Sequence, residues 1–336
     1  MNRGQYRAAI IGCGDVAAVH FAALEAFDQV DLAAVCDVDN AALERASAQY
    51  GVPGYADVTD LLAHEELDVV HVTTPHHQHA DPVVTALAAG VHVLAEKPLA
   101  HNLADADRII EAARNSQAKL GICFQNRYNV AAQTAHSLLR SGELGEVRGA
   151  AATVMWSRTE DYYRAKPWRG RWDQAGGGVL INQAIHTLDL LQWLVGDVER
   201  VEGHASGRFL REVSEVEDTA ELVMHHAGGQ RSVVFASLGH AVADPVMIEI
   251  VTDKAVLRIE GDLTIRYSDG RSEVIQERRI TTTGRDYWGV SHETLIRDFY
   301  AQLESDEPFW ISAEEARKSL KILTDVYELS PQLARN

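Results

Sequence analysis

The sequence predicts an α/β protein in which a dinucleotide-binding Rossmann domain is followed by a second domain. Three observations predict this fold: apolar runs alternate with helix-like periodicity in the first half, a glycine-rich turn follows the first run, and strand-like runs dominate the second half. At roughly 100–200 residues per domain, 336 residues suffice for two domains. We assign residues 1–125 to the Rossmann domain and residues 126–336 to the second domain.

The glycine-rich turn follows a predicted strand from Arg7 to Ile11 and has the pattern G-x-G-x-x-A. Gly12 would make the tight turn, Gly14 would let the backbone approach a pyrophosphate, and Ala17 would keep helix and strand close. The N-terminus of the next helix would face the anion. The turn therefore predicts cofactor contacts from Gly12, Gly14, Asp15, Val16 and Ala17.

A second apolar run, Asp31 to Cys36, ends at Asp37, about 20 residues after the turn. An acid at this place typically binds the ribose hydroxyls of NAD. Asp39 follows and no arginine comes directly after Asp37, so the 2′-phosphate of NADP would meet only negative charge. The sequence predicts NAD rather than NADP, and the alternative role for Asp37 is a turn or cap residue.

The alternation continues through a helix near 40–50, a short segment at 57–63, a strand at 68–73 and a helix near 79–89. Because parallel strands end at one edge of a sheet, the loop after the third strand should lie beside the glycine-rich turn. We predict cofactor contacts there from Thr74, Pro75 and His79. A metal site is the alternative, suggested by the four histidines His71, His76, His77 and His79. No carboxylate or thiolate stands in register with these histidines, so we predict no metal.

A strand at 91–95 brings Glu96, Lys97 and Pro98 to the same edge, and a helix at 103–117 and a strand at 120–124 complete the sheet. A lysine at the end of a buried strand is a candidate proton-handling group, because its pKa shifts readily on desolvation. The alternative is a surface Glu–Lys pair before a proline turn. We predict that Glu96 and Lys97 contact the cofactor, and a cis Lys97–Pro98 bond is a further hypothesis.

The segments GCGDVA, TPHHQHA, AGVHVLAEKPLA and FQNRYN, together with Asp37, resemble the Gfo/Idh/MocA family of NAD(P)-dependent oxidoreductases. The resemblance covers nearly the whole chain. It implies a C-terminal α+β domain with an open, mostly antiparallel sheet that joins subunits into a homodimer or homotetramer, and a last helix that packs back on the first domain. It also implies that Lys97 contacts substrate and nicotinamide, and that Arg127, Tyr128 and Tyr287 contact substrate.

The stretch from Trp156 to Trp172 is aromatic and basic in an otherwise acidic chain. This composition suits a pocket wall that stacks on a sugar ring and bonds its hydroxyls or a carboxylate. The alternative is a loop that packs against a neighbouring subunit. We predict substrate contacts from Arg158, Tyr163, Trp168 and Arg169.

Three glycines at 176–178 lead into a predicted helix that ends near Gly196. Its buried stripe would be formed by Ile181, Ile185 and Leu188, which leaves Asn182, His186 and Asp189 on another face. Histidine has the pKa for proton transfer near neutrality. The family pattern implies that His186 is catalytic and that Asn182 binds substrate. Inositol dehydrogenase-like members carry an aspartate instead of Asn182, and asparagine cannot take up a proton.

Further strand-like runs occur at 218–225, 231–237, 246–252, 255–260 and 263–267, with a hairpin turn at Gly228 and Gly229. The segment 287–292 should enter a helix that runs to about Ser305, and His292 is a further candidate for substrate contact. Ser312 and Glu315 form a capping box at the start of the last helix.

The net charge of −18 argues against nucleic-acid or anionic-membrane partners. The chain has no run of about 20 apolar residues, and we expect no export signal. Cys13, Cys36 and Cys123 cannot pair completely, which favours a reducing, cytoplasmic compartment.

The predicted function is NAD-dependent hydride transfer to or from a secondary alcohol of a cyclic sugar, sugar derivative or polyol, with Lys97 and His186 as catalytic residues. Two alternatives stay open within the resemblance. One is a redox-assisted glycosidase that reduces and reoxidises NAD in each cycle. The other is a sensor that binds NAD and a sugar without catalysis.

Overall fold

The computed structural model describes residues 6–278 and 291–333, so Tyr287 lies outside the described residues. The chain divides into two compact units. Unit 1 comprises Met1–Phe124 and Ser291–Arg317, and unit 2 comprises Gln125–Val290 and Lys318–Asn336.

Unit 1 contains a six-stranded parallel sheet in the order β3-β2-β1-β4-β5-β6. This is the Rossmann order, and it confirms the predicted fold. The order reverses between β1 and β4, so ligands are expected beyond the carboxyl ends of these strands. The strands are β1 (Tyr6–Ile11), β2 (Val30–Cys36), β3 (Gly54–Tyr55), β4 (Val69–Val72), β5 (His92–Glu96) and β6 (Leu120–Cys123).

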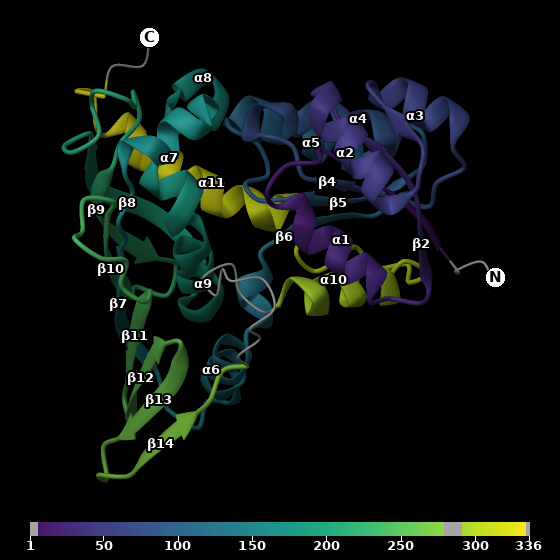
Figure 1. The fold of residues 1–336 in the computed structure, drawn as a ribbon. Helices are drawn as coiled ribbons and strands as arrows, with labels where there is room; N and C mark the ends of the chain where they lie inside the picture. The colour runs from purple at the N-terminus through teal and green to yellow at the C-terminus, as the bar shows by residue number, and fades with distance from the viewer. Residues whose placement is uncertain (1–5, 279–290, 334–336) are drawn as a thin grey trace. The chain divides into compact units, whose positions relative to one another are not determined.

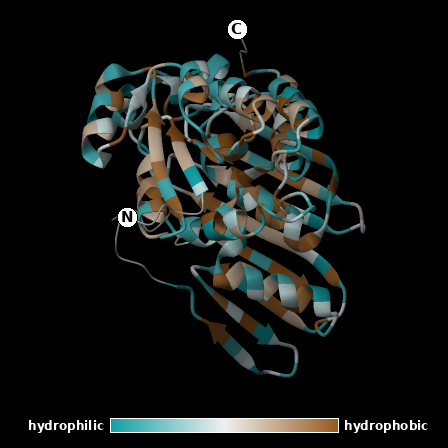
Figure 2. Cartoon of the chain, turned by 90° about the vertical axis from the view of Figure 1, so that its right-hand side faces the viewer, coloured by the Kyte–Doolittle hydropathy of each residue, from teal (hydrophilic) through white to brown (hydrophobic). Residues whose placement is uncertain are grey.

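Helices cover both faces of this sheet, α1 with α10 on one face and α4 with α5 on the other (Figure 1). Strands covered on both sides need apolar residues at successive positions, and β4 is buried along its whole length. Hydrophobic colour accordingly runs along the strands, while the outer helices show hydrophilic faces (Figure 2). The helices are α1 (Ala17–Glu25), α2 (Asn40–Tyr50), α3 (Val58–His64), η1 (His76–Gln78), α4 (Ala80–Ala88), α5 (Leu103–Arg114) and α10 (His292–Ala301).

Unit 2 contains an eight-stranded sheet in the order β14-β13-β12-β11-β7-β10-β9-β8. Only the pair β7 and β10 is parallel among these described strands, which confirms the predicted mostly antiparallel sheet. The strands are β7 (Val147–Met155), β8 (Val198–Ser206), β9 (Thr219–His226), β10 (Arg231–Ser237), β11 (Met247–Thr252), β12 (Ala255–Glu260), β13 (Asp262–Tyr267) and β14 (Ser272–Ile275).

Helices α9 and α6 lie along one face of this sheet (Figure 1). No helix among the described residues is both long and apolar enough to cross a membrane. The helical segments of unit 2 are η2 (Gln125–Tyr128), α6 (Val130–Ser141), α7 (Glu160–Ala165), η3 (Pro167–Gly170), α8 (Trp172–Ala175), the π-helix η4 (Leu180–Ala184) and α9 (Ile185–Val195). The last helix, α11 (Ala313–Glu328), begins in unit 1 and continues in unit 2. In unit 1, Arg317 of α11 bonds Asp107 of α5.

Candidate functional site

The glycine-rich turn between β1 and α1 has the geometry of a phosphate cradle. Gly12 has a φ of +95°, and a Cβ there would lie 2.8 Å from the backbone of Thr73 and Thr74. A Cβ on Gly14 would meet nothing within 4 Å, so the space outside the turn is open. No side chain caps α1, because Val16 at its N-cap makes no such bond. The backbone donors that begin a helix suit a pyrophosphate.

Asp37 directly follows β2, and its carboxylate connects the glycine-rich turn after β1 to the turn after β2. Its Oδ2 accepts the backbone N–H of Cys13 at 2.7 Å, and its Oδ1 accepts that of Asp39 at 2.8 Å. Each carboxylate oxygen has a second lone pair for a further donor such as a ribose hydroxyl. The residues at this edge therefore fit the adenosine half of NAD.

Lys97 follows β5 and is the single half-exposed side chain among the buried residues from Val93 to Ala100. The bond between Lys97 and Pro98 is cis, as hypothesised. The backbone N–H of Lys97 donates to Oε2 of Glu96 at 3.2 Å. The strand end thus directs the lysine out of the core, while the adjacent carboxylate holds its backbone.

Glu96 is buried and is the centre of a polar cluster. Its Oε1 accepts Nε2–H of His20 at 3.2 Å and Nε2–H of His292 at 3.1 Å. Burial alone would raise the pKa of the Glu96 carboxyl, but the hydrogen bonds from the two histidines outweigh burial and hold it well below its ordinary value. Glu96 is therefore an ionised framework residue with hydrogen bonds inside unit 1, and its contact with the cofactor stays a prediction.

The cluster extends into the core through His71 and Tyr300. Nδ1 of His20 lies 2.8 Å from Nδ1 of His71, and Nε2 of His71 lies 3.0 Å from the hydroxyl of Tyr300. Burial lowers the pKa of both histidines, so each is neutral and has one N–H. We assign a single direction of donation, from Tyr300 to His71 to His20 to Glu96, because it gives every nitrogen one role. Such a directed chain strengthens the bonds that reach the carboxylate.

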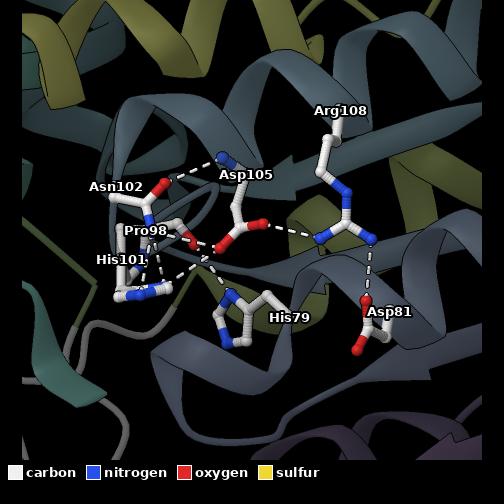
Figure 3. A network of polar contacts seen from close by, with 7 residues as sticks. All are labelled: His79, Asp81, Pro98, His101, Asn102, Asp105 and Arg108. Carbon is white, nitrogen blue, oxygen red and sulfur yellow. Dashed lines mark hydrogen bonds and ion pairs between the residues drawn. The ribbon is translucent and has the colours of Figure 1, made fainter. Parts of the chain in front are cut away.

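His79 ties the loop after β4 to the segment after β5. Its Nδ1 lies 2.8 Å from the carbonyl of Pro98 and its Nε2 lies 2.9 Å from the carbonyl of Thr74. Burial lowers the pKa of His79, whereas these two carbonyls raise it. The fully buried ring of His79 has a framework position, and its contact with the cofactor stays a prediction. Figure 3 shows this contact and a neighbouring network that joins α4 to α5 through Asp81, His101, Asn102, Asp105 and Arg108.

One group of described residues brings metal-ligating atoms close together. These atoms of His20, Glu96 and Cys123 lie within 4.8 Å of one another, and all three residues are buried. This set differs from the four histidines considered in the sequence. Glu96 already accepts two histidine N–H groups and a backbone N–H, so hydrogen bonds account for the cluster.

In unit 2, the segment from Gly177 to Gln192 is buried except at two positions, Asn182 and His186. They are four residues apart and so face the same side of the helix. The predicted stripe of Ile181, Ile185 and Leu188 is fully buried. An otherwise buried helix thus exposes an amide and an imidazole.

Two family descriptions match the chain. Residues 6–124 match the oxidoreductase family with an NAD-binding Rossmann fold, and residues 132–258 match the C-terminal domain of the Gfo/Idh/MocA proteins. The chain belongs to the Gfo/Idh/MocA oxidoreductase family. Residues 6–124 therefore form an NAD-binding domain, which confirms the cofactor expected from the glycine-rich turn and Asp37.

Several Gfo/Idh/MocA relatives match both units. D-apiose dehydrogenase of Paraburkholderia graminis is 29% identical over 278 residues, covering 79% of this chain and 71% of that protein. Myo-inositol 2-dehydrogenase of Thermotoga maritima is 26% identical over 338 residues, covering 94% and 93%. The WlbA dehydrogenase of Chromobacterium violaceum, solved with NADH and UDP-GlcNAcA, has a TM-score of 0.85 and 28% identity, covering 99% of this chain and 95% of that one.

Within this Gfo/Idh/MocA chain, Arg127 has a partner that the motif does not indicate. Its guanidinium forms two bonds with Asp189, at 2.7 and 2.6 Å, and both side chains are 1% exposed. Such a pair joins η2 to α9 and leaves Arg127 no exposed face for substrate. Arg127 thus has a framework role in this structure, and its substrate contact stays a prediction, as does that of the half-exposed Tyr128.

The aromatic and basic stretch forms an alternating stack. The guanidinium of Arg158 lies 5.0 Å from the ring centre of Trp156 and 5.1 Å from that of Tyr162. The guanidinium of Arg169 lies 4.3 Å from the ring centre of Tyr162 and 5.9 Å from that of Trp168. Tyr163, for which we predict a substrate contact, is only 2% exposed. Its neighbour Tyr162 lies between the two arginines.

The residues that contact the segments carrying Lys97 and His186 gave little signal in the sequence. His20 and Tyr300 gave only the weak signal of a polar group on a buried helix face. Glu217 and Tyr327 gave none beyond the three glycines, because their bond joins residues 110 apart in the sequence.

Proposed function

We propose that this chain transfers hydride between NAD and a secondary alcohol carbon of a cyclic sugar, sugar derivative or polyol. Lys97 and His186 would be its catalytic residues. The proposal is supported by relatives that bear the names of apiose and inositol dehydrogenases.

One observation carries the assignment of residues. In two otherwise buried segments, the side chains that reach solvent are the lysine of one and the histidine and asparagine of the other. Burying a polar side chain without a partner costs free energy, and lysine is seldom found within a buried segment. Isolated polar side chains in such segments therefore suggest a function. Each segment thus presents its reactive group and little else.

The roles follow from the chemistry of each group. NAD, when bound by Gly12, Gly14 and Asp37, supplies the carbon that accepts hydride. His186 takes the hydroxyl proton, since the pKa of histidine lies near neutrality and the amide of Asn182 cannot accept a proton. The ammonium of Lys97 stabilises negative charge that develops on the alcohol oxygen. Asn182 binds the hydroxyl and orients it.

The test is NADH formation across a panel of myo-inositol, D-apiose, D-glucose and UDP-GlcNAcA. We expect Lys97→Ala to lower kcat by about 10²–10³-fold, as for loss of an oxyanion-stabilising group, with NADH affinity retained. His186→Ala should lower kcat by about 10²–10⁴-fold. The controls Lys321→Ala and His64→Ala remove exposed residues of the same types from α11 and α3 and should keep the wild-type rate.

Contradicting results are specific. Undiminished turnover in Lys97→Ala or His186→Ala would remove that residue from the mechanism. A protein that binds NADH but reduces NAD with no member of the panel would favour the sensor. Cleavage of a glycoside without net NADH would favour the redox-assisted glycosidase.

We also propose a homo-oligomer, dimeric or tetrameric, formed through the open face of the unit 2 sheet. Val233, Phe235 and Val251 point away from the buried side of β10 and β11 and are 53%, 39% and 39% exposed. Strands β10 and β11 flank β7, and exposed apolar residues that gather on one face of a sheet commonly mark an interface. Phe235→Lys should dissociate the oligomer in sedimentation velocity, and an unchanged sedimentation coefficient would contradict this. We propose a cytoplasmic location, which the free cysteines Cys13, Cys36 and Cys123 support.

A further inference from the structure

The helix that carries Asn182 and His186 is capped by a glutamate from another element. Glu217, just before β9, is fully buried and receives three consecutive backbone N–H groups. Gly178 donates to Oε2 at 2.7 Å, Val179 to the carbonyl at 3.0 Å, and Leu180 to Oε1 at 2.9 Å. The first N–H groups of a helix have no partner within it. Glu217 supplies those partners from 39 residues further along the chain.

The same contact explains the glycines at this place. A Cβ on Gly178 would lie 1.8 Å from the carbonyl oxygen of Glu217, and one on Gly177 would lie 2.1 Å from the hydroxyl of Tyr327. That hydroxyl donates to Oε1 of Glu217 at 2.8 Å. The two glycines therefore let Glu217 and Tyr327 approach the backbone closely. This turn, which we call the joint, is packed against Glu217 and Tyr327.

The joint is connected directly to a reactive side chain. The carbonyl of Gly178, whose N–H is held by Glu217, accepts the backbone N–H of Asn182 at 3.0 Å. His186 follows one turn later on the same half-exposed face. A shift of the joint would therefore move both reactive side chains together.

We propose that Glu217, assisted by Tyr327, is a positioning residue that fixes where Asn182 and His186 meet the substrate. The roles of Asn182 and His186 rest on the proposed function. Glu217 acts through the backbone, since its bonds go to the turn and to Tyr327. A displacement of about 1 Å at a reacting group can cost about 100-fold in rate, so loss of this cap should affect catalysis more than binding.

The test compares two isosteric changes at adjacent carboxylates. Glu217→Gln places an NH₂ group against backbone donors, and we expect kcat to fall about 10–100-fold with the KM of the best panel substrate changed less than about threefold. Asp218→Asn is the matched control, because that carboxylate accepts N–H groups of a different loop, at Arg208, Phe209 and Leu210. It should keep kcat. Tyr327→Phe, which removes one bond, should give an intermediate loss.

Hydrogen exchange supplies a readout that does not depend on activity. The amides of residues 178–182 should exchange faster in Glu217→Gln than in the wild type or Asp218→Asn, under conditions where all are folded. Wild-type exchange and kcat in Glu217→Gln would overturn the proposal. A less stable Glu217→Gln variant with unchanged kcat would overturn it too, since the role would be structural only. If the wild type oxidises no panel compound, the proposed function fails, and unchanged exchange alone would still overturn the positioning role.

Discussion

Removing the carboxylate of Asp189 should destabilise unit 2 strongly. Asp189 receives two bonds from the buried guanidinium of Arg127, and Ser319 donates to the same carboxylate at 3.2 Å. In Asp189→Asn the buried guanidinium loses the negative charge of Asp189, and breaking a buried ion pair typically costs about 3–5 kcal/mol. For a unit of roughly 150–250 residues, about 2–4 °C corresponds to 1 kcal/mol. The melting temperature of unit 2 should therefore fall by about 6–20 °C.

The measurement is thermal and urea unfolding followed by tryptophan fluorescence. Trp193 is a local reporter, because the guanidinium of Arg127 lies 5.6 Å from its ring centre and His136 stacks on it at 4.0 Å. The control is Arg148→Met, which breaks an exposed ion pair with Asp253 and should cost only about 0–1 kcal/mol.

A double variant tests the reason for the loss. Arg127→Met combined with Asp189→Leu removes both charges and keeps apolar volume, so it should be more stable than Asp189→Asn. The reasoning is refuted if Asp189→Asn costs no more than Arg148→Met. A raised substrate KM in a folded, stable double variant would support the predicted role of Arg127 in substrate binding.

Four other predictions concern the cofactor turn and the buried carboxylates. Gly12→Ala should weaken NADH binding at least tenfold in fluorescence titrations, because its Cβ meets the backbone after β4 at 2.8 Å. Gly14→Ala should keep the wild-type melting temperature but also weaken NADH binding, and unchanged affinity would place the pyrophosphate elsewhere. Glu96→Gln should lower kcat while NADH affinity is kept, because the backbone of Lys97 and two histidines lose a charged acceptor. Burial raises the pKa of the Glu217 carboxyl from 4.5 to about 7, so the folded chain holds this proton more tightly than the unfolded chain. The free energy of unfolding should then fall as pH rises from about 4.5 to about 7, and Glu217→Gln should flatten that slope in urea titrations.

The Rossmann unit was predictable because its strands are apolar runs and its turn has a fixed glycine pattern. The strands β8 and β14 were not predicted, because neither forms an apolar run. β8 reads VERVEGHAS and β14 reads SEVI, and both expose much of their length. Their pairing with neighbouring strands gives them order that local sequence does not indicate.

The sequence indicates candidate reactive side chains, whereas it does not indicate the residues that support them. Lys97 and His186 lie in recognisable local patterns. Arg127 also lies in one, yet its partner is 62 residues away, and a charged residue in a motif is ordinarily expected to be exposed. Long-range pairs of this kind depend on the folded backbone, and one sequence without its fold does not indicate them.

Glu96 and Glu217 have a common structural role that their positions in the sequence do not suggest. Each is a buried carboxylate whose oxygens accept backbone N–H groups at the start of a segment that carries a reactive side chain. An apolar residue of similar size would generally serve stability at least as well as a buried ionisable group. A carboxylate offers several strong acceptors in one rigid plane, and such bonds fix a backbone more closely than packing alone. Catalysis depends on groups that are already in place when charge develops. The presence of one such carboxylate behind Lys97 and another behind His186 is therefore best explained by preorganisation of the two side chains that we propose to be catalytic.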